Sequence, residues 1–315
     1  MSKAVIPKRF LERYSSIVDD QKEFLEYLEK PLPKAFRVNT IKSDKKQVLE
    51  SLSEKGIVVE KVPWYEDAFV VGGGTSGHPI GNTIEHFMGY IYIQELVSML
   101  PGVLASGELT NKGLVIDVAA APGSKTTHLA ALMGNKGCII ANDISYERIK
   151  ALKFNIEKLG VLNAVVTNQD FRFFKLDNHK ADFILLDSPC TSEGTVRKEW
   201  DVLSEWSERR IIGMCRLQKQ LITKGFDMLK RGGSMVYSTC TFAPEENEEV
   251  VQYLLDNREG AKVEKIDLKG LKTCPGVEKW GKAEFSGEVK KVCRIWPHHN
   301  NTGGFFLAKV RKGVE

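Results

Sequence analysis

The segment Leu114–Thr126 reads LVIDVAAAPGSKT and indicates the fold class. Its first residues are apolar apart from Asp117, which is typical of a short buried strand. Small residues then form a tight loop, and a helix is expected through His128 and Leu132 to Gly134. Small side chains let a ligand approach the backbone, and a helix N-terminus offers N–H groups that have no partner within the helix. The segment therefore predicts a ligand-binding strand–loop–helix unit.

This loop lacks the two common nucleotide-binding patterns. No glycine stands where G-x-x-x-x-G-K-T requires one before Ser124, and G-x-G-x-x-G is absent as well. These absences argue against a phosphate-binding loop and against a nicotinamide cofactor. A second glycine run, Gly72–Gly77, has no strand-to-helix context, and we expect it to be a flexible turn.

From Leu114 onward, predicted strands and helices alternate. We expect strands at 114–118, 138–142, 164–168, 182–187, 233–238, 262–267 and 304–310, and helices at 125–134, 145–159, 204–230 and 244–256. This alternation predicts an α/β fold, a doubly wound and mostly parallel sheet with helices on both faces. The last strand follows Pro297 and Gly303–Gly304, and we expect it to run antiparallel at the edge of the sheet.

The first hundred residues follow another pattern. Helical periodicity over 5–30 stops at Pro31–Pro33, and a strand at 35–39, a helix ending at Lys55 and strands at 57–62 and 68–71 come next. This order predicts a small α+β unit. We therefore predict two domains, residues 1–105 and residues 106–315.

Composition limits the partners and the compartment. Lys and Arg number 45 against 41 Asp and Glu, so a nucleic-acid footprint has to be local, for instance at Lys42–Lys46 or Lys290–Lys291. The six cysteines show no C-x-x-C or Cys/His ligand spacing, which predicts no metal site. No apolar run approaches the ~20 residues that span a bilayer, and no signal segment is visible. We expect a cytoplasmic protein in a reducing compartment with no membrane partner, and a pairing of Cys274 with Cys293 stays open.

Carboxylates at strand ends indicate an adenosine-containing ligand. Asp117, Asp143, Asp170 and Asp187 end four predicted strands, and ligands of a doubly wound sheet bind across this edge. Asp143 comes 26 residues after Asp117, near the offset at which a second-strand acid accepts hydrogen bonds from ribose hydroxyls. Asp170 falls where a third-strand acid meets the adenine amino group. One such aspartate is as often a helix cap or a turn residue, but three in successive units favour a ligand.

An adenosine ligand without a phosphate-binding loop points to S-adenosylmethionine as the cofactor. Lys125, in the first turn of the predicted helix, is placed to neutralise the carboxylate of the cofactor or that of Asp187. We expect Arg148 to contact the cofactor as well.

Two cysteines carry the expected reactive chemistry. Cys190 in Asp187-Ser188-Pro189-Cys190 and Cys240 in Ser238-Thr239-Cys240 each follow a predicted strand. A thiolate that adds to carbon 6 of cytosine makes carbon 5 nucleophilic toward a methyl sulfonium. The reaction needs that nucleophile, a group that binds the base near ring nitrogen 3, and a base for elimination. Asp187, Cys190 and Cys240 can fill these roles, although a lone cysteine after a strand is usually a small buried residue.

With these residues, the chain closely resembles the Sun-type RNA cytosine-5 methyltransferases, and among them the archaeal tRNA enzymes. The resemblance covers residues from about 5 to 312. The matching segments are Phe36–Asn39, Ala119–Lys125, Asp187–Thr195, Tyr237–Thr241, Pro244–Glu248, Arg294–His298 and Gly303–Phe306.

The resemblance implies the role of each site residue. Cys240 would be the nucleophile, Cys190 would aid product release, Asp187 would bind the cytosine, and Lys125 would belong to the catalytic set. The cofactor site would comprise Ala119, Ala120, Ala121, Pro122, Gly123, Ser124, Lys125, Asp143, Arg148, Asp170 and Asp187. DNA cytosine-5 enzymes use a Pro-Cys thiol resembling Pro189-Cys190 as nucleophile, so the opposite order of the two thiols stays open.

The resemblance also implies that residues 1–105 recognise RNA and that residues 106–315 form a Rossmann-like methyltransferase domain. We expect RNA contacts from Arg37, Asn39, Arg294 and His298. The expected substrate is tRNA, because a compact chain without long basic tails suits a small folded RNA, and the expected state is a monomer. Ribosomal RNA, a DNA substrate and a non-catalytic RNA-binding assembly factor are the alternatives.

Overall fold

The computed structural model describes residues 6–73, 79–177 and 179–314, and most of the predicted turn at Gly72–Gly77 lies outside them. The chain forms two compact units. One comprises Met1–Leu32 with Leu186–Glu315, and the other comprises Pro33–Leu185. The chain passes from the second unit to the first within strand β8 (Ala181–Asp187). The predicted domain boundary between residues 105 and 106 stays a prediction.

The unit Pro33–Leu185 begins with an antiparallel sheet in the order β2-β3-β1-β4. Its strands are β1 (Ala35–Val38), β2 (Val59–Lys61), β3 (Ala68–Val71) and β4 (Ile91–Ile93). Helix α3 (Lys45–Glu54) is capped by the Asp44 carboxylate, which accepts hydrogen bonds from the backbone of residues 46 and 47. Val48 and Leu52 of α3 pack with Phe36 and Phe69 of the sheet. The predicted small α+β unit is confirmed, with β4 as an additional strand.

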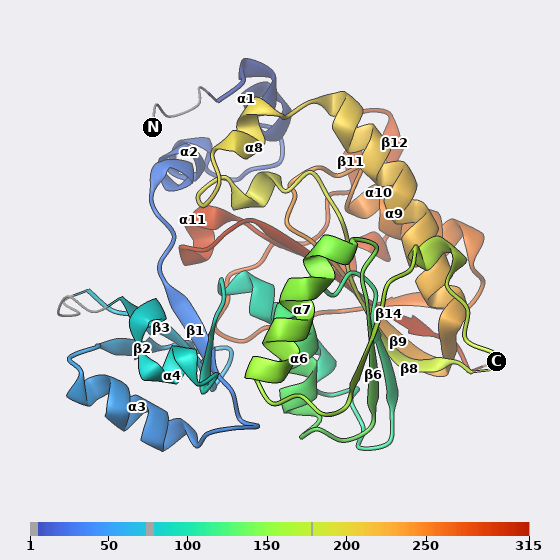
Figure 1. Cartoon of the computed structure of the whole chain (residues 1–315). Helices are drawn as coiled ribbons and strands as arrows, with labels where there is room; N and C mark the ends of the chain where they lie inside the picture. The colour runs from blue at the N-terminus through green and yellow to red at the C-terminus, as the bar shows by residue number, and fades with distance from the viewer. Residues whose placement is uncertain (1–5, 74–78, 178, 315) are drawn as a thin grey trace. The chain divides into compact units, whose positions relative to one another are not determined.

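The same unit continues with four parallel strands in the order β8-β5-β6-β7. These are β5 (Leu114–Asp117), β6 (Cys138–Asn142), β7 (Ala164–Thr167) and β8. Helices α6 (Ser124–Leu132) and α7 (Tyr146–Lys158) lie side by side (Figure 1). The strand order reverses at β5, since β6 flanks it on one side and β8 on the other. Ligands of open α/β sheets bind at such a switch point, at the carboxyl ends of the strands, and the loop after β5 begins there.

The other unit contains strands β9 (Leu229–Thr239), β14 (Phe305–Lys312) and β10 (Ala261–Glu264) in the order β10-β14-β9. Strand β14 is antiparallel to both neighbours, as predicted for the last strand. Its predicted edge position is wrong, because β10 pairs with its outer side. The burial pattern explains this order. The first four residues of β14 are all buried, which suits an interior strand, whereas β10 exposes Lys262, as edge strands commonly do.

The helices of this unit differ from the prediction at their ends. The predicted helix 204–230 is divided into α8 (Asp201–Ser204) and α9 (Glu208–Met228), because the Ser207 side chain caps α9. Helix α10 (Glu248–Asn257) begins four residues later than predicted and lies beside α9 (Figure 1). None of the helices in the described residues is long and apolar enough to cross a membrane.

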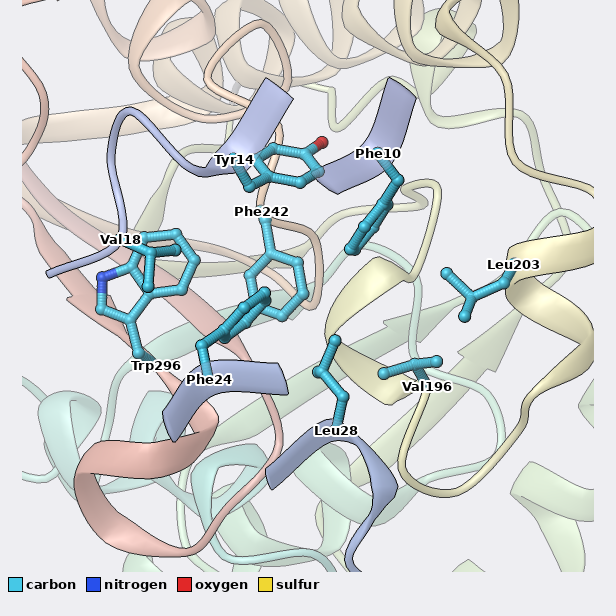
Figure 2. Close-up of a cluster of buried hydrophobic side chains, with 9 residues drawn as sticks. All are labelled: Phe10, Tyr14, Val18, Phe24, Leu28, Val196, Leu203, Phe242 and Trp296. Carbon is cyan, nitrogen blue, oxygen red and sulfur yellow. The ribbon is translucent and has the colours of Figure 1, made fainter. Parts of the chain in front are cut away.

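Helices α1 (Lys8–Tyr14) and α2 (Gln21–Glu29) bury an aromatic face in this unit. Figure 2 shows Phe10, Tyr14 and Phe24 gathered around Phe242, two residues after Cys240. The Phe242 ring stacks on Trp296 with centroids 5.2 Å apart. The helical pair therefore packs directly on the segment that carries one of the candidate cysteines.

The remaining elements are short. They are η1 (Ile80–Asn82), α4 (Ile84–Phe87), η2 (Val97–Met99), α5 (Leu100–Ala105), η3 (Phe171–Phe173), η4 (Glu193–Thr195), β11 (Lys279–Trp280), β12 (Ala283–Glu284), η5 (Val289–Lys291), β13 (Cys293–Ile295) and α11 (Pro297–Asn300).

Candidate active site

The two candidate cysteines lie together in the unit that contains Leu186–Glu315. Cys190 follows β8 and Cys240 follows β9, and their sulfur atoms are 3.3 Å apart. Neither cysteine forms a disulfide bond. The separation is well beyond the ~2.05 Å of a disulfide bond, so the contact is that of a thiol with a neighbouring sulfur. Two thiols at this distance can act on the same atom or bond of a substrate.

Backbone hydrogen bonds align the two cysteine loops. The Ser188 amide donates to the Ser238 carbonyl at 2.8 Å, and the Gly194 amide donates to the Cys240 carbonyl at 2.7 Å. The Gly304 amide donates in turn to the Gly194 carbonyl at 2.9 Å. A side chain at Gly194 would place its Cβ only 2.2 Å from the Gly304 oxygen, so the close approach of these backbones requires glycine.

The Cys190 thiol is held in its protonated form. The hydrogen bond to the Cys240 sulfur, together with burial, holds the pKa of the Cys190 thiol well above its ordinary value of 9.0. Cys190 therefore keeps its proton, and either sulfur can be the donor in the contact between the two. A proton between two sulfur atoms stabilises negative charge on whichever of them is ionised, so the contact suits a thiol paired with a thiolate.

Asp187 ends β8, three residues before Cys190. The Ser238 hydroxyl of strand β9 donates to its Oδ1 at 2.7 Å, and this bond fixes the carboxylate. The structure thus brings Asp187, Cys190 and Cys240 together within one unit. Lys125 belongs to the other unit.

The predicted cofactor loop follows β5 in the unit Pro33–Leu185. The Ala120 amide donates to the Asn142 carbonyl at 2.7 Å, and the Gly123 amide donates to the Ala120 carbonyl at 2.7 Å. Gly123 has φ +104° and precedes α6, and a Cβ there would stand 3.0 Å from the Leu152 side chain. The loop is therefore tight, as the sequence predicted, and the structure adds that it depends on glycine at residue 123.

Asp143 and Arg148 are connected to this loop. The buried Asp143 carboxylate accepts hydrogen bonds from the amides of Ala121, at 3.1 Å, and Ser145, at 2.9 Å. The Arg148 guanidinium lies 3.5 Å from Asp143 and donates to the Ala121 carbonyl. The structure therefore joins the predicted ribose-binding acid to the loop after β5.

Asp170 lies in the turn after β7. Its carboxylate accepts hydrogen bonds from the Arg172 guanidinium at 3.0 Å, and this bond lowers the pKa of Asp170. Asn142, at the end of β6, donates to the carbonyls of Val118, at 3.1 Å, and Gln169, at 3.0 Å. Asn142 thus links the loops after β5 and β7, a role that the sequence did not reveal.

These residues fit an adenosine-containing cofactor. Ile144 and Phe173 are 64% and 74% exposed, and they follow Asp143 and Asp170 closely in the chain. A purine ring can pack on exposed apolar side chains of this kind. The combination of carboxylates, a small-residue loop and apolar surface matches a ribose, an approaching ligand backbone and a base.

Lys125 is buried in the first turn of α6. Burial, with the positive charges of Arg37 and Lys125, holds the pKa of His128 well below its ordinary value. The neutral His128 ring contacts the Tyr65 hydroxyl at 2.9 Å. Lys125 therefore belongs to a buried cationic cluster beside the cofactor loop, where an anionic group of a ligand would be favoured.

Two predicted RNA contacts are buried side chains of the small sheet and its connection. The Arg37 guanidinium donates to Thr127 Oγ1 at 2.7 Å and to the Ser124 carbonyl at 3.3 Å. The Asn39 amide donates to the carbonyls of Gly89, at 2.8 Å, and Leu159, at 2.9 Å. Both side chains are 0% exposed, so they connect segments of their own unit.

The other two predicted RNA contacts are buried as well. Arg294 forms a buried ion pair with Glu248 and donates to the Phe242 carbonyl at 2.9 Å. His298 Nε2 lies 2.8 Å from the Asp19 carboxylate. RNA contact by these four residues stays a prediction, and burial argues against it because their polar groups are bound inside the protein.

One group of described residues has side chains that could bind a metal ion. The ligand-type atoms of Asp19, His298 and His299 lie within 4.8 Å of one another. The Lys272 ammonium is 3.6 Å from the same Asp19 carboxylate. The carboxylate is already satisfied by hydrogen bonds with the two imidazoles and by the ion pair with this ammonium. We therefore assign no metal to the cluster.

Several polar residues around the cysteines had no predicted role. Thr191 and Thr241 each follow a cysteine, and their hydroxyl oxygens are 2.9 Å apart. Glu193 and Glu246 are fully buried beside them. The sequence did contain a signal for the two threonines, the dipeptide Cys-Thr that occurs twice. Two identical dipeptides, each just after a strand, suggest that the two loops pair with each other.

Comparison with known proteins agrees with this arrangement. The family model described as 16S rRNA methyltransferase RsmB/F matches residues 105–311, and the N-terminal domain of 16S rRNA methyltransferase RsmF matches residues 6–96. A tRNA (cytosine(49)-C(5))-methyltransferase of Pyrococcus abyssi is 42% identical over 98% of this chain and 96% of its own length. The ribosomal RNA small subunit methyltransferase F of Vibrio atlanticus is 40% identical over 98% of this chain, which spans 64% of that enzyme.

Solved structures are also similar. A methyltransferase homolog protein from Pyrococcus horikoshii has a TM-score of 0.84 and 37% identity, over 97% of this chain and 95% of that one. NSun6 from Pyrococcus horikoshii, solved with SFG, has a TM-score of 0.83 and 27% identity, over 98% of both chains.

The fold is therefore that of the class I, S-adenosylmethionine-dependent methyltransferases, with a small N-terminal α+β domain. The chain belongs to the RsmB/F family of RNA methyltransferases, which includes the Sun-type enzymes.

Proposed function

We propose that this chain methylates carbon 5 of a cytosine in tRNA through a covalent adduct between Cys240 and carbon 6 of the base. The observation that carries this proposal is the pair of thiols 3.3 Å apart beside a fixed carboxylate. Methylation at a ring nitrogen or a ribose oxygen needs no thiol, whereas attack by carbon 5 needs a nucleophile at carbon 6 and a later elimination.

Each of the three residues Cys240, Asp187 and Cys190 has its own role in the proposed reaction. We assign the bond to carbon 6 to the Cys240 sulfur, which lies 3.3 Å from the Cys190 sulfur. The Asp187 carboxyl, fixed by Ser238, binds the base near ring nitrogen 3. After methylation, carbon 5 loses its proton, the C–H electrons form the carbon 5–carbon 6 double bond, and the Cys240 sulfur leaves with the electrons of the C–S bond. We assign assistance in this last step to Cys190.

S-Adenosylmethionine, when bound, supplies the methyl group as an electrophile. We assign its binding to the loop Ala119–Lys125 with Asp143, Arg148 and Asp170. In this assignment Asp143 holds the ribose, since it is buried and fixed by two backbone amides, and Lys125 contributes positive charge toward the carboxylate of the cofactor.

The choice of tRNA rests on the Pyrococcus abyssi relative, which is named for a tRNA cytosine and matches this chain over nearly its whole length. Ribosomal RNA is the second candidate, because both family models and the Vibrio atlanticus enzyme are named for it. The chain spans only 64% of that enzyme, and the tRNA assignment is therefore favoured.

Methyl transfer from radiolabelled S-adenosylmethionine tests the proposal. Unmodified tRNA, small-subunit ribosomal RNA and duplex DNA serve as substrates, and nucleoside analysis identifies the product. We expect labelled 5-methylcytidine from tRNA with the wild type and with Cys138→Ala, a matched control for a cysteine outside the pair, and none with Cys240→Ala. Label in ribosomal RNA alone, or a product other than 5-methylcytidine, would contradict the proposal.

A further inference from the structure

Two buried carboxyl groups flank the cysteine loops. Glu193 lies in η4, and Glu246 lies in the turn between Cys240 and α10. Both side chains are 0% exposed. Their partners are hydroxyls, amides and an indole. Burial of an ionised carboxylate is costly unless charge or hydrogen bonds compensate it, so the protonation of this pair has to be explained.

The two threonines that follow the cysteines connect these carboxyls. Glu246 Oε1 is hydrogen-bonded to Thr191 Oγ1, and Thr191 Oγ1 lies 2.9 Å from Thr241 Oγ1. Thr241 Oγ1 lies 2.8 Å from Glu193 Oε2. Four oxygen-bearing groups thus form a continuous chain with three contacts.

Counting protons shows what this chain requires. Each threonine hydroxyl carries one proton that it can donate, so the two hydroxyls supply two protons for three contacts. With both carboxyls ionised, one contact would be left as two facing acceptors in a buried site, which is unfavourable. All three contacts are hydrogen bonds only if one of the two carboxyls carries a proton.

The partners of the carboxyl oxygens locate this proton. Glu193 Oε1 accepts a hydrogen bond from the Trp206 indole, and Glu193 Oε2 accepts one from the Phe242 amide at 3.0 Å. The Tyr14 hydroxyl lies 2.7 Å from each of these two oxygens. Both Glu193 oxygens thus face at least one N–H donor. Glu246 Oε2 accepts hydrogen bonds from the Thr191 amide, at 3.0 Å, and from Gln218 Nε2, at 2.8 Å.

Glu246 Oε1 differs from these three oxygens. Among the described residues its hydrogen-bond partners are hydroxyls alone, those of Thr191 and, at 3.5 Å, Thr241. A hydroxyl can accept a proton from a carboxylic acid, whereas an indole or amide N–H cannot. Burial raises the pKa of both carboxyls, that of Glu246 to about 8, which agrees with a proton held by the pair.

We propose that Glu246 carries a proton on Oε1 and donates it to Thr191, which donates to Thr241, which donates to an ionised Glu193. This directed chain holds the two cysteine loops together. Glu246 and Glu193 are positioning residues, since they act through the threonines. The protonation is independent of the proposed function, and only its consequence for the cysteines rests on that function.

This series of hydrogen bonds is well placed to set the distance between the sulfur atoms of Cys190 and Cys240. Thr191 and Thr241 are covalent neighbours of Cys190 and Cys240, so a shift of either hydroxyl moves the adjacent sulfur. Gln218, which donates to Glu246, also donates to the Pro189 carbonyl at 2.8 Å. Tyr14 adds a hydrogen bond to Glu193 at 2.7 Å, from helix α1.

Glutamine substitutions provide an asymmetric test. In Glu246→Gln the amide nitrogen can take the place of the protonated Oε1 and the amide oxygen that of Oε2, which preserves every donor and acceptor. In Glu193→Gln the NH2 group would face the Trp206 or Phe242 N–H, and two donors would oppose each other. Glu246→Ala removes the carboxyl group that donates the first hydrogen bond of the series.

Two readouts follow these variants. The first is the rate of covalent adduct formation with an RNA substrate containing 5-fluorocytosine. We expect Glu246→Gln to stay within about threefold of the wild type, and Glu246→Ala to fall by about 10²-fold because the sulfur atoms are misplaced. We expect the rate of adduct formation by Glu193→Gln to fall by more than about 10-fold. Far-UV circular dichroism and S-adenosylmethionine affinity serve as controls for folding.

The second readout is the infrared spectrum in D₂O, where a buried carboxylic acid shows a carbonyl band separate from carboxylate bands. The wild-type-minus-Glu246→Gln difference spectrum should contain this band at neutral pH. Its absence, or tolerance of Glu193→Gln together with failure of a folded Glu246→Gln, would overturn the inference. Because the infrared band needs no RNA, it tests the inference even if no variant forms an adduct and the proposed function fails. If Glu193→Gln does not fold, the two Glu246 variants and the band decide.

Discussion

Replacing Phe242 by alanine tests whether the aromatic cluster anchors the segment that follows Cys240. The Phe242 side chain is 1% exposed, and its ring centroid lies 5.2 Å from that of Trp296 and 5.4 Å from that of Phe24. Gly304 approaches the ring so closely that a Cβ at residue 304 would stand 2.1 Å from it. The ring is therefore enclosed on several sides (Figure 2), and little can move in to fill the space that its removal leaves.

A buried Phe→Ala change that leaves a cavity of this kind costs about 3–5 kcal/mol of unfolding free energy. We expect Phe242→Ala to lie within this range. The measurement is urea unfolding, followed by far-UV circular dichroism and by tryptophan fluorescence, with linear extrapolation to water.

Phe173→Ala is the matched control, since the Phe173 side chain is 74% exposed and its loss should change stability by less than about 0.5 kcal/mol. A loss below about 1 kcal/mol for Phe242→Ala would refute the argument. It would mean that α1 and α2 do not hold the segment after Cys240.

Four further predictions concern the site and its support. Cys190→Ala should accumulate a protein–RNA adduct that survives denaturing electrophoresis, because release fails, and no adduct would contradict the role assigned to Cys190. Asp143→Asn should weaken S-adenosylmethionine binding by about 10-fold in calorimetry, since a charged acceptor of the Ala121 amide is lost; unchanged affinity would remove Asp143 from the cofactor site. Arg294→Met should destabilise the protein by about 3–5 kcal/mol in urea unfolding, because Glu248 is left buried without its partner; a neutral effect would contradict the importance of this pair. The pKa of Glu246 is raised in the folded state from 4.5 to about 8, so its contribution to stability is fully present below pH 4.5 and is lost as the pH rises toward about 8. Over this window the wild type should lose up to about 1.4 kcal/mol per pH unit relative to Glu246→Gln, measured by urea unfolding at several pH values, and parallel pH profiles would show that Glu246 does not titrate there.

Local patterns predicted the strand–loop–helix unit because its signals are short-range. Apolar residues at 114–118, small residues at 119–123 and the start of α6 follow one another in the chain, and the structure places them in that order. The pairing of Cys190 with Cys240 was also accessible, since both follow strands whose carboxyl ends meet at one edge of a sheet.

Long-range packing was not accessible from the sequence. Arg294 and His298 read as surface cations, but their partners Glu248 and Asp19 lie 46 and 279 residues away and hold them in the interior. The sequence likewise did not show which strand pairs with the outer side of β14. In the structure this strand is β10, whose exposed Lys262 suits an edge position. The proton on Glu246 follows only when four side chains from two loops are seen in contact.

Mapping the covalent adduct is the most direct test of the assignment of Cys240. The wild-type enzyme is incubated with S-adenosylmethionine and a tRNA substrate containing 5-fluorocytosine, whose fluorine blocks the final elimination and traps the adduct. Trypsin separates the two thiols, because Cys240 falls in the peptide 232–258 and Cys190 in the peptide 181–197. Mass spectrometry should find the methylated nucleotide on the peptide that contains Cys240. A nucleotide on the peptide that contains Cys190, or methylation without any trapped adduct, would contradict the mechanism.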